Sequence, residues 1–150
     1  SGMRRCSPVS ASTEVLLCDT SGLFAFFDRR DPQHRRAAEA IDADPGPFVV
    51  SPYVVAELDY LLASRRGTDA EQAALEELSA GAWELPCLEA ADVRRAVEVV
   101  NAYADQDIGL ADASLVVLSG RYKTDRVLTL DHRHFRVLRT PAGGPFEILP

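Results

Sequence analysis

The chain has 150 residues, 47% of them hydrophobic, which is enough for one domain with a core of its own. Its net charge of −7 counts against a general nucleic-acid binder, because phosphate contacts by lysine and arginine supply much of the affinity of such proteins. No apolar run approaches the roughly 18 to 20 residues that a membrane span needs, so we expect a soluble, cytoplasmic protein without membrane contact.

The beginning of the chain carries no predicted element. Residues 1–14 are expected to be a cloning scar (Ser-Gly-Met) followed by a polar N-terminal extension, and the domain is expected to span residues 15–150. The three cysteines, Cys6, Cys18 and Cys87, lack the close spacing of metal-binding pairs. They predict neither a zinc site nor a disulfide framework, and they fit a reducing compartment.

Strands and helices alternate along the first half of the chain. An apolar run before Asp19 predicts a buried strand. Asp31-Pro32 predicts a helix start, because aspartate caps the free backbone N–H groups and proline fits the first helical position. Ser51-Pro52 repeats this signal, and the apolar residues after it recur with the spacing of one helical face. The elements expected here lie at 14–18, 21–27, 32–43, 48–50, 52–66 and 68–80.

The second half continues the alternation and includes one helix that is apolar on nearly every side. Regular alternation of strands and helices predicts an α/β fold, with a central, mostly parallel sheet flanked by helices in a single domain. The elements expected here are a weak strand at 83–85, helices at 90–103 and 110–122, a strand at 126–130 and an edge strand at 146–149.

Asp19 and Asp131 each follow directly after a buried strand. In a parallel sheet the carboxyl ends of the strands form the ligand-binding edge, so both carboxylates are expected at the same edge. Either one could instead cap the helix that follows it. Two acids delivered to one edge are better explained by a cation site.

Asp112 is the only charged residue between positions 108 and 119, a segment with the pattern of a buried helix. A buried carboxylate without a partner costs several kcal/mol or takes up a proton. We therefore expect Asp112 to have a partner. That partner is either a basic side chain, with Arg121 and Arg126 as candidates, or a cation shared with other acids.

Glu57 lies beside the apolar stripe of its helix and faces partly inward. If it joins Asp19, Asp112 and Asp131, each close pair of carboxylates repels by on the order of 4 kcal/mol, for a separation of about 4 Å and an effective dielectric constant near 20. Such a cluster persists only with protons, arginines or a bound cation. Its oxygen ligands favour Mg²⁺, with Mn²⁺ as a substitute.

Basic charge gathers in one segment although the whole chain is acidic. Between residues 121 and 140, six basic residues stand against two acidic ones. All basic residues of the chain except Lys123 are arginine, whose planar guanidinium suits phosphate. A nucleic-acid-binding face and an ordinary solvated surface both explain this segment.

Four motifs together resemble the PIN-domain nucleases, in particular the VapC-like toxins of bacterial toxin–antitoxin pairs. A strand that ends in Asp-Thr-Ser says little alone, but the four motifs occur in the family's order along residues 15–150. The motifs are LLCDTSGLFAFFD at 16–28, SPYVVAEL at 51–58, GLADAS at 109–114 and LTLDHRHF at 128–135.

The resemblance implies a PIN-like nuclease domain with an acidic pocket that binds Mg²⁺. By this resemblance Asp19, Glu57, Asp112 and Asp131 would be both the metal ligands and the catalytic acids. Ser21 would help to position the water or an acid of the site.

The implied activity is that of an endoribonuclease toxin that cleaves structured RNA, with transfer or ribosomal RNA favoured. Attack by a metal-activated water, rather than by the neighbouring 2′-hydroxyl, predicts 5′-phosphate and 3′-hydroxyl ends. The family also implies a cognate antitoxin protein that occupies the pocket, and a homodimer. Asp107, in the loop before the third motif, is an additional candidate carboxylate.

Other functions are open to the same residues. A receiver-like signalling domain, phosphorylated on aspartate, would also gather Mg²⁺-binding acids, but it needs a lysine after a late strand, and Lys123 precedes that strand. A phosphatase of the haloacid dehalogenase type would need an aspartate in place of Ser21. A metal-free ribonuclease could use His132 and His134, but their spacing does not put them on one helical face. The resemblance makes His134 a packing residue beneath the last acid.

Overall fold

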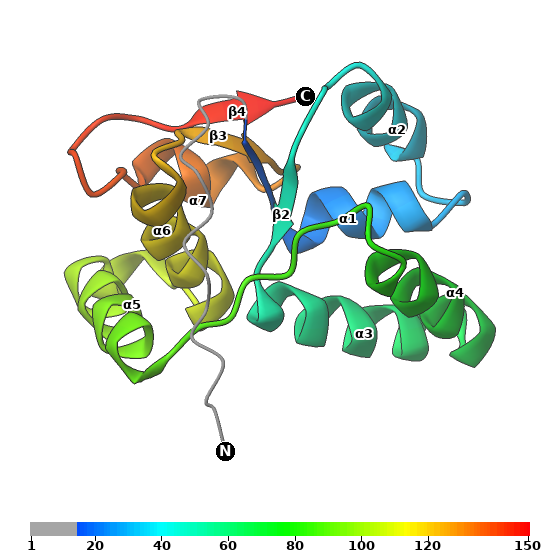
Figure 1. Ribbon diagram of the computed structural model, residues 1–150, viewed down its shortest axis with the longest axis horizontal. Coiled ribbons are helices and arrows are strands. Elements are labelled where there is room, and N and C mark those ends of the chain that lie inside the picture. Colours follow the sequence, from blue (N-terminus) through cyan, green and yellow to red (C-terminus); the bar gives the residue numbers. More distant parts are fainter. Residues whose placement is uncertain (1–14) are drawn as a thin grey trace.

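A four-stranded sheet lies at the centre of the computed structural model, which describes residues 15–150 (Figure 1). Its strand order is β2-β1-β3-β4, and every neighbouring pair is parallel. The expectation for residues 1–14 lies outside the described residues. The strands are β1 at Leu16–Cys18, β2 at Phe48–Val50, β3 at Arg126–Leu128 and β4 at Glu147–Leu149.

The register of the strands brings the carboxyl ends of β1, β2 and β3 to one level. Cys18 pairs with both Val50 and Leu128. The residues that follow the strands, among them Asp19 and Thr129, therefore leave the sheet at the same edge. The backbone N–H of Asp19 donates to Leu128 O at 2.9 Å, which fixes this level. This is the edge at which parallel sheets bind ligands.

Helices pack around the sheet on both sides. Helix α5 packs on α6, α3 packs on α4, and α1 contacts both α2 and α3. In Figure 1, α5 and α6 lie to the left of β2, and α2 and α4 lie to the right. The helices are α1 at Thr20–Phe27, α2 at His34–Asp42, α3 at Pro52–Arg66, α4 at Thr68–Ser79, α5 at Ala90–Ala102, η1 (a 3-10 turn) at Ala104–Gln106, α6 at Leu110–Tyr122 and α7 at His132–Val137. Among residues 15–150, none of these helices has both the length and the apolar character needed to cross a membrane.

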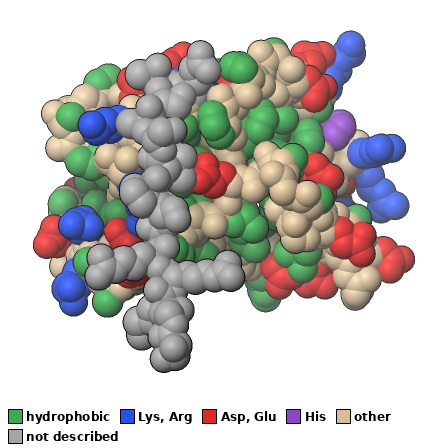
Figure 2. Space-filling view, viewed as in Figure 1, with side chains coloured by type: hydrophobic (Ala, Val, Ile, Leu, Met, Phe, Trp, Pro, Cys, Tyr) green, Lys and Arg blue, Asp and Glu red, His purple; other side chains and the backbone are tan. Residues whose placement is uncertain are grey.

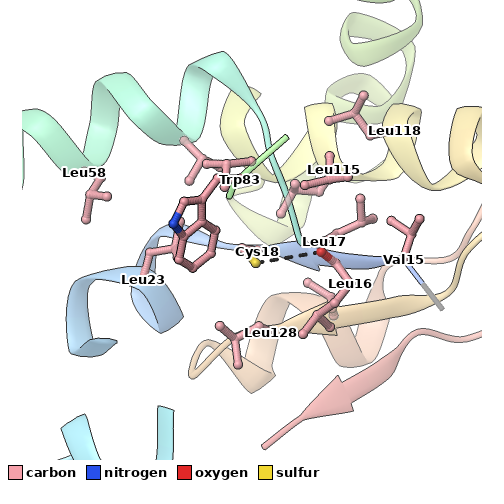
Figure 3. Packing of buried hydrophobic residues seen from close by; sticks show 14 of the residues in the cluster. Val15, Leu16, Leu17, Cys18, Leu23, Leu58, Trp83, Leu115, Leu118 and Leu128 are labelled. Atoms are coloured by element: carbon pink, nitrogen blue, oxygen red, sulfur yellow. Dashed lines mark hydrogen bonds between the residues drawn. The ribbon is translucent and has the colours of Figure 1, made fainter. Parts of the chain in front are cut away.

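The core is built on strand β1, which is buried on both faces. Leu17 and Cys18 are fully buried, and Leu115 and Leu118 of α6 lie on one side of the strand (Figure 3). Leu128 of the neighbouring strand β3 is also fully buried. Each large aliphatic side chain buried in this way contributes about 1.5–3 kcal/mol. Because the core holds β1, β3 and α6 together, the polar residues at their ends have fixed positions.

The α/β fold with a parallel central sheet in a single domain is confirmed, and two local predictions are wrong. Helix α2 begins at His34, two residues later than predicted. The Asp31 carboxylate accepts the backbone N–H of Gln33 at 2.7 Å and so holds a turn ahead of the helix. The weak strand predicted around Glu84 is a single bridge to Val49.

Cys18 and Cys87 differ in whether their sulfur atoms are bonded. Cys18 is a free thiol within the core, and burial raises its pKa, with further rises from the carboxylates of Asp44 and Asp19. A thiol with a raised pKa is a poor nucleophile, so Cys18 acts as a small core residue. Cys87 is disulfide-bonded, so the argument from cysteine spacing against disulfides is wrong at this position.

Candidate active site

Acidic side chains from separate elements line one cleft at the carboxyl edge of the sheet. Its volume is about 510 Å³, and Ser21 lies in its wall as well. The acids that line it are Asp19, Asp31, Glu57, Asp107, Asp112 and Asp131. The structure thus brings together the four acids expected from the sequence, and Asp107 lies with them.

Asp19 is almost fully buried and is held by two hydroxyl groups. Thr129 Oγ1 donates to Asp19 Oδ2 at 2.8 Å, and Ser21 Oγ lies 3.3 Å from the same oxygen. Ser21 Oγ also lies 3.1 Å from Thr129 Oγ1 and accepts the backbone N–H of Leu130 at 2.9 Å. The Asp19 side chain makes no capping hydrogen bond to α1, so the capping alternative is excluded there. The hydroxyl network instead fixes the carboxylate at the cleft.

The electrostatics of Asp19 reflect the crowding of acids around it. Burial, and after it the carboxylates of Asp112 and Asp131, raise the pKa of Asp19 to about 7, while the hydrogen bond from Thr129 acts in the opposite direction. A carboxyl group with this pKa is close to half protonated at neutral pH. Carboxyl groups perturbed in this way are concentrated at functional sites.

Asp112 lies in the first turn of the buried helix α6, and its side chain is only 14% exposed. Burial raises the pKa of Asp112, the nearby charge of His134 lowers it, and the carboxylates of Asp131 and Glu57 raise it. Asp112 therefore interacts with the other acids of the cleft although they come from distant parts of the chain.

The arginines considered as partners of Asp112 are engaged elsewhere. Arg121 Nη2 lies 2.9 Å from Asp92 Oδ2, and Arg126 pairs with Asp44. Within residues 15–150, no arginine or lysine forms an ion pair with any of the four expected acids. The alternative of a structural arginine partner is therefore not supported for Asp112.

Helix α7, which only the capping alternative for Asp131 implied, places His134 between two of the acids. Asp131 caps this helix and accepts the backbone N–H of His134 at 3.4 Å. The alternative that Asp131 caps the helix after it is therefore confirmed. His134 Nδ1 lies 2.9 Å from Asp131 Oδ2 and 3.0 Å from Asp112 Oδ2. This nitrogen is buried and is not aligned for a hydrogen bond to either carboxylate.

His134 therefore lies against the last acid, as the resemblance implies, and it also lies against Asp112, which was not expected. Its neighbour Phe135 does pack in the core, where it is 1% exposed. The signal for His134 was its position three residues after Asp131, because residues three apart are neighbours on a helix.

One wall of the cleft comes from α3. Glu57, Leu61 and Arg65 recur every fourth residue, which puts them on one face of the helix, and all three line the cleft. Glu57 is exposed, so its carboxylate remains in water. Arg65 Cζ lies 5.6 Å from the centroid of the Phe24 ring. Neither Thr129 nor Arg65 was singled out from the sequence.

The donor chemistry of the cleft suits a hard divalent cation, since all four acids offer oxygen ligands. Within residues 15–150, however, no group of three His, Cys, Asp or Glu side chains is already arranged to hold a metal ion. Asp19 accepts from Thr129, while Asp112 and Asp131 both lie against His134. The residue types therefore fit such an ion, and their side chains would have to turn toward it.

Known proteins similar to this chain agree on its family. The model of the PIN domain family matches residues 16–139. Ribonuclease VapC26 from Mycobacterium tuberculosis is 53% identical over 135 residues, which cover 90% of this chain and 100% of that protein.

Two solved structures share the fold. The crystal structure of VapC20 from M. tuberculosis, described as a sarcin-ricin loop cleaving toxin, matches with a TM-score of 0.74 at 20% identity, over 78% of this chain and 90% of that one. A toxin–antitoxin complex from Klebsiella pneumoniae matches with a TM-score of 0.65 at 19% identity, over 90% of this chain and 96% of that one.

The family match includes all four motifs that carry the expected acids, and the 53% identical relative spans nearly the whole chain. Neither finding favours a receiver-like signalling domain. The chain belongs to the PIN-domain family and is a VapC-like member of it.

Proposed function

We propose that this protein is a Mg²⁺-dependent endoribonuclease that acts as the toxin of a toxin–antitoxin pair. The proposal rests on one observation: Asp19, Glu57, Asp112 and Asp131 line a single cleft, and no arginine or lysine of residues 15–150 pairs with them. The relative at 53% identity is named a ribonuclease, which supports the same activity here.

The four acids would hold Mg²⁺, or Mn²⁺ in its place. Such an ion, when bound, lowers the pKa of a water and offsets negative charge at the scissile phosphate. The raised pKa of Asp19 supports this assignment, because a cation would relieve the repulsion that contributes to it.

The chain's own residues would position and deprotonate the attacking water. Ser21 and Thr129 keep the Asp19 carboxylate in one orientation. His134 lies between Asp112 and Asp131 and would position both. One of the cleft carboxylates accepts the proton of the water. The water oxygen then bonds to phosphorus as the bond to the 3′-oxygen breaks, and the 3′-oxygen takes a proton from solvent, leaving 5′-phosphate and 3′-hydroxyl ends.

The proposed substrate and partners are those expected of a VapC-like toxin. We infer a structured RNA, either transfer or ribosomal RNA, and VapC20, described as cleaving the sarcin-ricin loop, supports this class of target. We also infer a cognate antitoxin protein, since a relative in fold was solved as a toxin–antitoxin complex. A homodimer in the cytoplasm is part of the same proposal.

The test is cleavage of purified transfer and ribosomal RNA with Mg²⁺ and with EDTA, followed by mapping of the new 5′ ends. We expect cleavage only with Mg²⁺. Asp112→Asn should abolish it, while Asp69→Asn, at an exposed position on α4, should cleave like the wild type. Circular dichroism checks that both variants fold. Cleavage at an equal rate in EDTA would contradict the metal-dependent mechanism, and normal cleavage by Asp112→Asn would contradict the assignment of that acid.

A further inference from the structure

Arg65 is the only arginine or lysine among the described residues that line the acidic cleft. It lies two helical turns after Glu57, on the same face of α3. An RNA strand that enters the cleft brings one negative charge for each phosphate to a place already lined by six carboxyl groups. Binding there requires positive charge from the protein as well as any cation held by the acids.

The guanidinium of Arg65 is held in place but is not neutralised. It lies over the Phe24 ring, with 5.6 Å between Cζ and the ring centroid, and a stacked guanidinium keeps its N–H donors at the edges of its plane. In the part of the chain that the structure describes, no carboxylate forms an ion pair with it. Its neighbour Arg66 differs, because Arg66 Nε lies 2.6 Å from the buried carboxylate of Asp28.

On the face that Figure 2 shows, most Lys and Arg side chains lie among acidic ones, apart from a small basic group at the right-hand edge (Figure 2). An arginine beside the acids is therefore well placed to act on the substrate, since a planar guanidinium can donate two N–H groups to one phosphate.

We propose that Arg65 binds a backbone phosphate of the RNA next to the phosphate that is cleaved. This inference rests on the proposed function, because it assigns a substrate contact to the same cleft. The contact is to phosphate and not to a base, so it serves affinity and positioning without reading sequence.

The experiment measures RNA binding apart from cleavage. The protein carries Asp112→Asn to prevent cleavage, and its affinity for a fluorescein-labelled single-stranded oligouridylate is followed by fluorescence anisotropy with Mg²⁺ at several salt concentrations. We expect Arg65→Gln to bind about tenfold more weakly, as for loss of one charge-assisted contact. The slope of log affinity against log salt should fall by about 0.7, as for one released counterion on a single strand.

The controls separate this role from a structural one. Arg94→Gln, at an exposed position on α5, removes the same charge outside the cleft and should leave affinity and salt slope unchanged. Arg65→Lys keeps the charge and should retain the salt slope. Arg65→Met keeps an apolar stem over Phe24, and it replaces the Gln variant if that variant fails to fold.

Two outcomes are decisive and distinguishable. If the parent binds the oligouridylate and the folded Arg65 variants bind it with the same affinity and salt slope, the role of Arg65 is overturned and the proposed nuclease function stands. If the parent does not bind the oligouridylate and the wild type cleaves neither transfer nor ribosomal RNA, the proposed function itself fails, and the role of Arg65 fails with it.

Discussion

Replacement of Asp19 by asparagine is expected to make the metal-free protein more stable at alkaline pH. Burial and the neighbouring carboxylates raise the pKa of Asp19 from 3.8 to about 7 in the folded protein. The folded state therefore holds this proton more tightly than the unfolded chain does. The contribution of Asp19 to stability is complete below the unfolded pKa of 3.8 and is lost as the pH rises through about 7.

The size of this loss follows from the two pKa values. At about 1.36 kcal/mol for each pKa unit, the wild type loses on the order of 4 kcal/mol between acidic and alkaline pH through this one group. Asparagine does not titrate, and its carbonyl oxygen can still accept the hydrogen bond from Thr129. The difference in unfolding free energy between the two proteins should therefore move in favour of the variant as the pH rises.

The assay is urea denaturation of both proteins in EDTA at several pH values between about 4 and 8. Comparison of the two proteins at each pH largely cancels the titration of groups that they share. A second series contains Mg²⁺, which at 100 times its dissociation constant should stabilise the wild type by about 2.7 kcal/mol and the variant by less. A difference between the two proteins that stayed constant across the pH range would refute the argument that Asp19 is a buried, crowded acid.

Two further substitutions test the hydrogen bond to Asp19 and the packing of α1 against β3. Thr129→Val removes the hydroxyl that donates to Asp19 while keeping the shape of the side chain, so the pKa of Asp19 should rise further and Mg²⁺-dependent cleavage should fall about tenfold, measured by initial rates. Unchanged rates would mean that Ser21 alone suffices. Gly22→Ala should destabilise the fold by about 1–3 kcal/mol in urea denaturation, because its Cβ would lie 2.9 Å from Leu128 Cγ and 3.0 Å from Leu128 O. Wild-type stability would show that β3 can shift to make room.

Much of the fold and the location of the acids could be predicted from the sequence. Runs of apolar residues such as the one before Asp19 marked strands that are buried on both faces, and the rule for parallel sheets placed Asp19 and Asp131 at one edge. Asp112 stood out because it is the lone charge in a segment that had to be buried. These inferences depend on local pattern and on burial, both of which a single sequence carries.

The contacts that organise the acids could not be predicted in this way. Thr129 reaches Asp19 across more than a hundred residues of chain, and no local pattern distinguishes its hydroxyl from that of any other threonine. The approach of His134 to Asp112 depends on helix α7, a six-residue element too short to leave a periodic signal. The sequence does not distinguish Arg65 from its neighbour Arg66, whereas in the structure Arg66 forms an ion pair with Asp28.

The neighbours of the acids explain how the cleft can exist before an ion is bound. Thr129 and Ser21 supply hydrogen-bond donors around Asp19, and the imidazole of His134 lies where Asp112 and Asp131 would otherwise face each other alone. Each of these groups offsets part of the repulsion among carboxylates, but none carries the double positive charge of a divalent ion. The raised pKa values of Asp19 and Asp112, which come first from burial and then from the neighbouring carboxylates, reflect the cost of ionisation that is not offset. That residual free energy favours any cation that enters the cleft, so the same burial that destabilises the metal-free fold strengthens binding of the ion that the proposed chemistry requires.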